Sequence, residues 1–203
     1  MRRKSRTRIT GIAAVGVAAM TALALAAPIA QADNSRSRAA QVSPDAAAAS
    51  VLTWPQLVKL LRIPKPGGWS SGDLTSWEVG NQVSGSRLFA NVQTAGSFSM
   101  IYTGVDSFTD SGAAAQMWTM LAEAAAARED VTVLSRTANE SVTYGVGQYR
   151  ERLVTVSRLF GTWYVMSSCQ TRKPKVSVAT LTACAKKVAK AQQKKSAPVV
   201  APA

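Results

Sequence analysis

This 203-residue sequence contains no histidine, so acid–base or nucleophilic chemistry would fall to other side chains, with carboxylates, serines and lysines among them. That absence removes the commonest general base, every Ser-His-Asp or Cys-His arrangement, and most zinc and copper sites. A pair of carboxylates could still hydrolyse a glycoside. The candidate acids fall mostly at expected turns and helix starts, where capping and solvation explain them: Asp73, Glu78, Asp106, Asp110, Glu123, Glu140 and Glu151. We therefore expect no catalytic residue, no metal site and no cofactor.

Two weaker signals for chemistry have simpler structural explanations. Gly145-Val146-Gly147 resembles part of a glycine-rich phosphate loop, but no helix start follows at the needed spacing, so a flexible turn or bulge is preferred. A Ser–Lys hydrolase needs a serine beside a buried lysine, and the lysines cluster on an exposed helix. A histidine-independent hydrolase is kept as an alternative function.

The tryptophans offer a candidate ligand contact. Trp69 and Trp77 lie in a segment rich in glycine and serine, residues 69–83, that is read as a loop followed by one short strand. Exposed aromatic rings can stack on a sugar or hold an apolar ligand, whereas a tryptophan in a loop can also cover the core. Trp69 and Trp77 are therefore candidate contacts for a small ligand, with a cover over the core as the alternative. Trp118 and Trp163 fall on expected inward faces and are assigned to the core.

Positive charge is concentrated late in the chain. Residues 33–171 contain eleven basic and eleven acidic residues, whereas residues 172–195 contain eight basic residues and no acid. Such clustering indicates contact with an anionic partner, either a cell-wall polymer or phospholipid headgroups. The predicted contacts are Lys186, Lys187, Lys190 and Lys194. A solvated helix face is the alternative, and nucleic acid is not an expected partner because no recognition motif appears.

The first 32 residues have the three parts of a secretory signal peptide. The opening MRRKSRTR is basic, residues 9–30 are uncharged, and Ala30-Gln31-Ala32 matches a small-x-small cleavage site. We predict cleavage near Ala32–Asp33 and a secreted, extracellular mature protein. An uncleaved anchor is the alternative, since about twenty apolar residues can span a bilayer. Arg2-Arg3 leaves twin-arginine export open beside general secretion.

Cys169 and Cys184 are the two cysteines of the chain. An even number of cysteines in an exported protein indicates a disulfide. A reactive or metal-binding pair is the alternative, but two thiols without a histidine cannot complete a usual zinc site. We predict a disulfide between them. Closing a loop of about fifteen residues stabilises a protein by about 3 kcal/mol in the chain-entropy model.

The apolar periodicity and the turn residues predict the elements that carry these side chains. Helices are expected over 53–63, 113–128 and 177–195, and strands over 86–93, 97–105, 131–137, 148–158 and 162–169. Thr53 with Gln56 forms a capping box, Asp110 or Ser111 caps the central helix, and Gly161 suits a tight hairpin turn. Hairpins with segregated helices indicate an α+β fold with a single antiparallel sheet, helices packed against it, and one disulfide.

The ends of the mature chain have the composition of disordered segments. Residues 33–49 are a Ser/Ala/Gln/Arg-rich linker, and residues 196–203 are a Pro/Ala-rich tail. The intervening 50–195 are enough for one domain with a core and too few for two, so we predict a single α+β domain and a monomer.

The order of these elements resembles that of secreted actinobacterial sensor-type domains, including the extracellular domain of PknH-like serine/threonine kinases. The matching features are the helix within LTWPQLVKLLRIP, the alanine-rich helix within DSFTDSGAAAQMWTMLAEAAAAR, a β-hairpin, and a terminal helix that bears a cysteine. The likeness covers roughly residues 50–192. It implies a non-enzymatic ligand-binding or sensor-like domain. An inhibitor or partner of another exported protein is a further alternative.

Overall fold

The computed structural model describes residues 42–63, 68–80, 82–91, 96–147 and 150–200, which lie within one compact unit, 37–203. The predicted signal peptide, residues 1–32, lies outside the described residues. The helices of the described part are α2 (Pro44–Ala49), α3 (Trp54–Leu61), α4 (Ser111–Ala126) and α5 (Val178–Val200). Its strands are β1 (Trp69–Ser71), β2 (Thr75–Val79), β3 (Gln82–Asn91), β4 (Met100–Phe108), β5 (Val131–Arg136), β6 (Glu140–Val146), β7 (Arg152–Phe160) and β8 (Trp163–Thr171).

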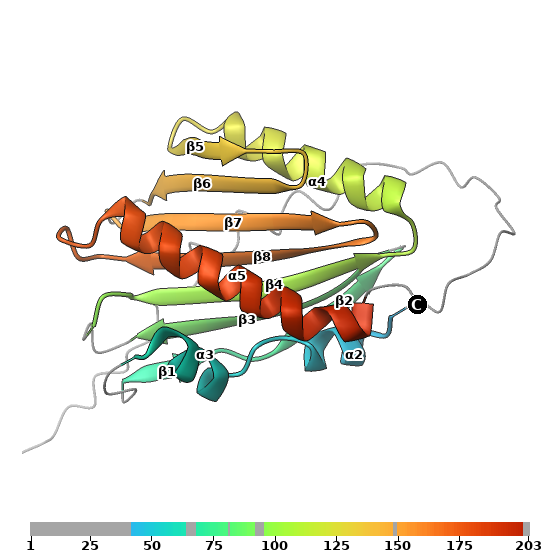
Figure 1. The fold of residues 1–203 in the computed structure, drawn as a ribbon, viewed down its shortest axis with the longest axis horizontal. Coiled ribbons are helices and arrows are strands. Elements are labelled where there is room, and N and C mark those ends of the chain that lie inside the picture. The colour runs from blue at the N-terminus through green and yellow to red at the C-terminus, as the bar shows by residue number, and fades with distance from the viewer. Residues whose placement is uncertain (1–41, 64–67, 81, 92–95, 148–149, 201–203) are drawn as a thin grey trace, which may run out of the picture. The chain divides into compact units, whose positions relative to one another are not determined.

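These strands form one eight-stranded sheet in the order β1-β3-β4-β8-β7-β6-β5, with β2 also paired to β3 (Figure 1). Every pairing is antiparallel. The chain leaves β4 through α4 and enters β5 at the far edge, and the meander from β5 to β8 then returns to pair with β4. The structure confirms the predicted α+β class, with a single antiparallel sheet and helices packed against it.

The two faces of the sheet carry different helices. On β8, Val165 and Cys169 pack in the core cluster that includes α5, whereas Tyr164 packs in the cluster that includes Ala114 and Trp118 of α4. Since successive residues of a strand point to opposite faces, α5 and α4 cover opposite faces. Figure 1 shows α5 running across its face of the sheet, and α2 and α3 contact α5 on that side. We call these the α5 face and the α4 face.

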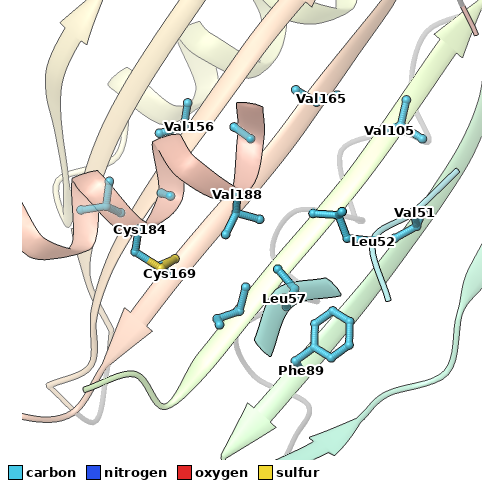
Figure 2. Packing of buried hydrophobic residues seen from close by; sticks show 14 of the residues in the cluster. Val51, Leu52, Leu57, Phe89, Val105, Val156, Val165, Cys169, Cys184 and Val188 are labelled. Carbon is cyan, nitrogen blue, oxygen red and sulfur yellow. A yellow bond between two sulfur atoms is a disulfide. The ribbon is translucent and has the colours of Figure 1, made fainter. Parts of the chain in front are cut away.

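The larger core lies under α5 (Figure 2). Its members come from both helices and strands: Leu57 of α3, Phe89 of β3, Val105 of β4, Val165 of β8 and Val188 of α5 are all fully buried. Burying a side chain of this kind contributes about 1.5–3 kcal/mol. One continuous apolar layer therefore holds α3 and α5 to the same sheet.

The local signals at the ends of elements are confirmed. The backbone N–H of Thr53 donates to the Gln56 side chain at 2.9 Å where α3 begins. The Asp110 carboxylate accepts from the N–H of Ala113 at 2.7 Å where α4 begins, so Asp110 is the cap. Gly161 joins β7 to β8 with φ of +60°, the left-handed conformation that a tight hairpin turn favours in glycine.

The strand predictions need two corrections. Residues 69–83 hold two short strands, β1 and β2, which pair with different parts of the same edge of β3. Gly145 and Val146 belong to strand β6, not to a turn or bulge, and we predicted no strand there. Val142 and Tyr144 of β6 pack on the core in alternation with small polar residues, and the serine, threonine and glycine content hid that pattern. Residues 94 and 95, between the strands predicted over 86–93 and 97–105, lie outside the described residues.

Two segments predicted to be disordered are helical where they are described. Residues 44–49 form α2, and α5 continues from 196 to 200. Tertiary contacts explain both, since the α2 backbone lies directly on Gly85, where a Cβ would come within 2.7 Å of Ala47. Ser196 at the far end of α5 is fully buried. Short helices are ordered by such packing more than by propensity, so the ordered unit extends beyond 50–195.

Candidate functional site

The predicted disulfide between Cys169 and Cys184 is present and fixes the orientation of α5. It joins β8 to the first half of α5, with the two Cα atoms 6.1 Å apart. Both cysteines are buried in the main core, to which Val188 of α5 also belongs (Figure 2). One side of α5 is therefore held against the sheet, and the opposite side faces solvent.

Three of the four predicted contact lysines share that outer side. Lys187, Lys190 and Lys194 are exposed, and their spacing of three and four residues places them in one row along the helix. We call these three residues the lysine stripe. None of the helices in the described part combines the length and apolarity needed to cross a membrane. The stripe is thus a cationic surface on a helix that packs on the sheet.

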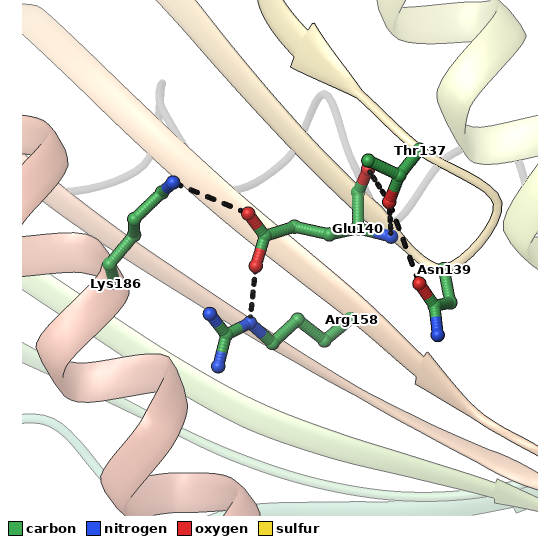
Figure 3. Close-up of polar contacts among 5 residues, drawn as sticks. All are labelled: Thr137, Asn139, Glu140, Arg158 and Lys186. Carbon is green, nitrogen blue, oxygen red and sulfur yellow. Dashed lines mark hydrogen bonds and ion pairs between the residues drawn. The ribbon is translucent and has the colours of Figure 1, made fainter.

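Lys186 does not belong to the lysine stripe, because it forms an ion pair with a carboxylate of the sheet. Its Nζ lies 3.3 Å from Oε1 of Glu140, whose Oε2 accepts from Nε of Arg158 at 2.6 Å (Figure 3). Burial raises the pKa of Glu140, but the bonds and charges of Arg158 and Lys186 outweigh it, so this pKa lies below its ordinary value. Lys186 therefore pins α5 to the start of β6, and contact with an outside anion would have to compete with Glu140.

In the last part of the sequence, which includes α5, every charged side chain is basic. From residue 152 to the end, the chain contains ten basic residues and no acid. Within the described residues, the cations that pair with carboxylates are Arg128, Arg158, Arg172 and Lys186. The stripe lysines are not among them and form no ion pair there. A surface with this distribution attracts anions, and the attraction weakens as salt is added.

The structure places the two candidate tryptophans on opposite faces. Trp69 lies on the α5 face, where its ring stacks on Trp54 with a centroid separation of 4.9 Å, and Trp54 stacks on Phe89. Trp77 pairs with Ser84 in the register of β2 and β3, which puts it on the α4 face. The two rings therefore cannot hold one ligand between them, and Trp69 acts as a cover of the core.

The buried carboxyl of Asp106 lies on the α4 face, as Trp77 does, with β3 between their two strands. Asp106 is 7% exposed and sits within β4, between Ser84 of β3 and Tyr164 of β8. Its Oδ1 accepts from Nε2 of Gln82 at 2.9 Å. Burial raises the pKa of Asp106, and hydrogen bonds from Ser84, Gln82 and Tyr164 oppose that rise only in part. We expected a turn here because the predicted strand ended at Val105.

Replacing Asp106 with asparagine should change the pH dependence of stability. A raised pKa means that the folded protein holds this proton more tightly than the unfolded chain, so stability falls as pH rises from the ordinary value of 3.8 through the raised pKa. Asp106→Asn removes this decline. Urea unfolding across a pH series measures it, and identical pH profiles for the two proteins would contradict the assignment.

The same carboxyl affects the tyrosines around it. Burial, with the charge of Asp106 as a further cause, raises the pKa of Tyr102 to about 12 and that of Tyr164 well above its ordinary value. Both hydroxyls therefore stay protonated at any physiological pH.

Among the described residues no group of three or more His, Cys, Asp or Glu side chains could hold a metal ion.

A buried glutamine joins three parts of the fold beneath α5. Gln192 is 0% exposed, and its Oε1 accepts from the backbone N–H of Leu52 and from Oγ1 of Thr103, both at 3.0 Å. Its Nε2 donates to the carbonyl of Ser50 at 3.0 Å and to Oγ of Ser196 at 2.6 Å. All four hydrogen-bonding positions of the carboxamide are filled. The inward position of a glutamine on α5 was the sequence signal for this network.

Comparisons with known proteins give a fold likeness. No protein-family model matches the chain, and no curated protein matches its sequence. Among solved structures, the chain is similar to the extracellular domain of PknH from Mycobacterium tuberculosis. The TM-score is 0.44 and the sequence identity 8%, with 77% of this chain and 99% of that domain covered. This is the domain whose order of elements the sequence was expected to resemble.

Proposed function

We propose that this chain is an exported, non-enzymatic domain, ligand-binding or sensor-like, that attaches to an anionic component of the cell envelope through the lysine stripe of α5. The observation that carries the proposal is the stripe itself: Lys187, Lys190 and Lys194 lie exposed in one row, in a region of the chain without acids. The disulfide between Cys169 and Cys184 supports a working location in an oxidising compartment, as does the signal peptide predicted over residues 1–32.

The chemistry of the stripe matches phosphate-bearing surfaces. Lysine ammonium groups are compact charges on flexible stems, and they attract closely spaced anions without demanding a fixed geometry. Each lysine near an anionic membrane surface contributes about 1 kcal/mol. Removing the three charges should therefore weaken attachment by about 100-fold.

Binding to vesicles tests the proposal. The mature protein is sedimented with phosphatidylcholine vesicles that contain or lack phosphatidylglycerol. We expect it to pellet only with the anionic vesicles and to be released as salt is added. The variant Lys187→Gln, Lys190→Gln, Lys194→Gln should stay in the supernatant, because it lacks the stripe.

A charge-matched variant separates the stripe from net charge. Lys59, Lys173 and Lys175 are exposed lysines outside the stripe. Their joint replacement by glutamine removes the same total charge and should leave vesicle binding largely intact. Equal loss in both triple variants, or retention of the stripe variant on anionic vesicles, would count against the proposal.

The alternative functions have less support. A two-carboxylate hydrolase built on the buried Asp106 would need a second acid beside it, whereas the groups that hydrogen-bond to this carboxyl are the neutral Gln82, Ser84 and Tyr164. A role as an inhibitor or partner of another exported protein is tested by co-purification from culture fluid. Trp77 stays a candidate ligand contact on the α4 face.

A further inference from the structure

Two basic side chains approach each other beneath α5. Arg87 lies on the α5 face of β3, directly across from Thr103 of β4. The hydroxyl of Thr103 donates to Gln192 of α5, and Lys195 follows Gln192 by one helical turn. The ammonium group of Lys195 donates to the carbonyl of Val51, in the connection between α2 and α3. Arg87 comes from the sheet and Lys195 from the helix, and the charge of Arg87 acts on the ammonium group of Lys195.

Neither side chain has an acidic partner there. The ion pairs of the described residues do not include Arg87 or Lys195. The Nε atom of Arg87 is buried and has no hydrogen-bond partner. Burial and the charge of Arg87 both lower the pKa of Lys195. Two like charges are therefore held close together, half-buried, with one donor unused.

We propose that Arg87 and Lys195 form a binding site for a small oxyanion, the phosphate or carboxylate group of a ligand. An oxyanion would accept from the unused Nε of Arg87 and would neutralise the repulsion between the two cations. A guanidinium presents its donors as a planar fork that fits two oxygens of such a group, while an ammonium adds a point charge. The site goes beyond the proposed function, because it takes a single group and uses none of the stripe lysines.

Thermal unfolding of the mature protein tests the site with inorganic phosphate as the probe, against chloride at matched ionic strength. At about ten times the dissociation constant, phosphate should raise the Tm by about 3–5 °C. Lys195→Met and Arg87→Lys should lose most of this rise, the first through the missing charge and the second through the missing fork. Lys175→Met, which removes an exposed charge outside the lysine stripe, should respond as the wild type does.

The outcomes separate binding from general salt effects. Phosphate also stabilises proteins by exclusion from their surfaces, so an equal rise in all four proteins would overturn the site. No rise in the wild type would overturn it as well. Acetate run beside phosphate identifies the group, since the larger shift marks the preferred oxyanion. The stripe variant should keep the phosphate response, which distinguishes failure of this site from failure of the attachment surface.

Discussion

Replacing Gln192 with leucine is expected to lower the free energy of unfolding by about 3–5 kcal/mol, because it removes four hydrogen bonds to buried groups. The N–H of Leu52 loses Gln192 as its acceptor, and so does the hydroxyl of Thr103. Ser50 and Ser196 lose the donor that both share. Leucine has a similar volume, so the loss reports hydrogen bonding more than packing. Urea unfolding measures the change.

The neighbouring glutamine provides the control. Gln193 is half-buried on α5 and makes no side-chain hydrogen bond within the described residues. Gln193→Ala should change the free energy of unfolding by no more than about 0.5 kcal/mol. Comparable losses for the two variants would show that the helix position, and not the carboxamide network, determines stability.

Loss of the disulfide is the second large effect. Cys184→Ser should lower the free energy of unfolding by about 3 kcal/mol, since the closed loop spans a sequence separation of 15 residues. The bond also joins α5 to the middle of the sheet, so its loss should loosen the helix that carries the lysine stripe. Thermal unfolding with and without a reducing agent measures the effect.

Reduction distinguishes the bond from the substitution. The wild type should melt at a lower temperature when reduced, whereas Cys184→Ser should be insensitive to the reducing agent. A wild-type Tm that is the same under reducing and oxidising conditions would refute a stabilising role for the bond. A buried serine hydroxyl has its own cost, and Cys184→Ala separates that cost from the loss of the bond.

The features predicted from the sequence were those with local causes. The caps at Thr53 and Asp110 and the turn at Gly161 depend on residues a few positions apart, and the structure has all three. The pairing of Cys169 with Cys184 followed from their number alone. The class of the fold followed from the spacing of apolar residues, which is set by the period of each element.

The features that were missed depend on contacts distant in sequence. Asp106 was assigned to a turn because nothing near it shows that β4 continues between β3 and β8. The order of residues 44–49 depends on their backbone resting on Gly85, about forty residues away. The faces of Trp69 and Trp77 depend on the register of β1 and β2 against β3, which neither segment specifies alone.

At the candidate site, the lysines show the same difference between features with local causes and features that depend on distant contacts. Helical spacing was enough to place Lys187, Lys190 and Lys194 on a common row. It could not reveal that Lys186 is bound by Glu140, because that carboxylate belongs to a strand that was not predicted. The site that we infer at Arg87 and Lys195 was equally hidden, since it depends on the packing of α5 on β4, the neighbour of β3.

Sedimentation of the mature protein with isolated cell envelopes across a salt series tests attachment most directly. The account predicts that the wild type pellets at low salt and is released as salt rises, and that the Lys187→Gln, Lys190→Gln, Lys194→Gln variant stays soluble throughout. If the wild type does not pellet at any salt concentration, or the variant pellets equally well, the lysine stripe is a solvated helix face and the proposed attachment is wrong.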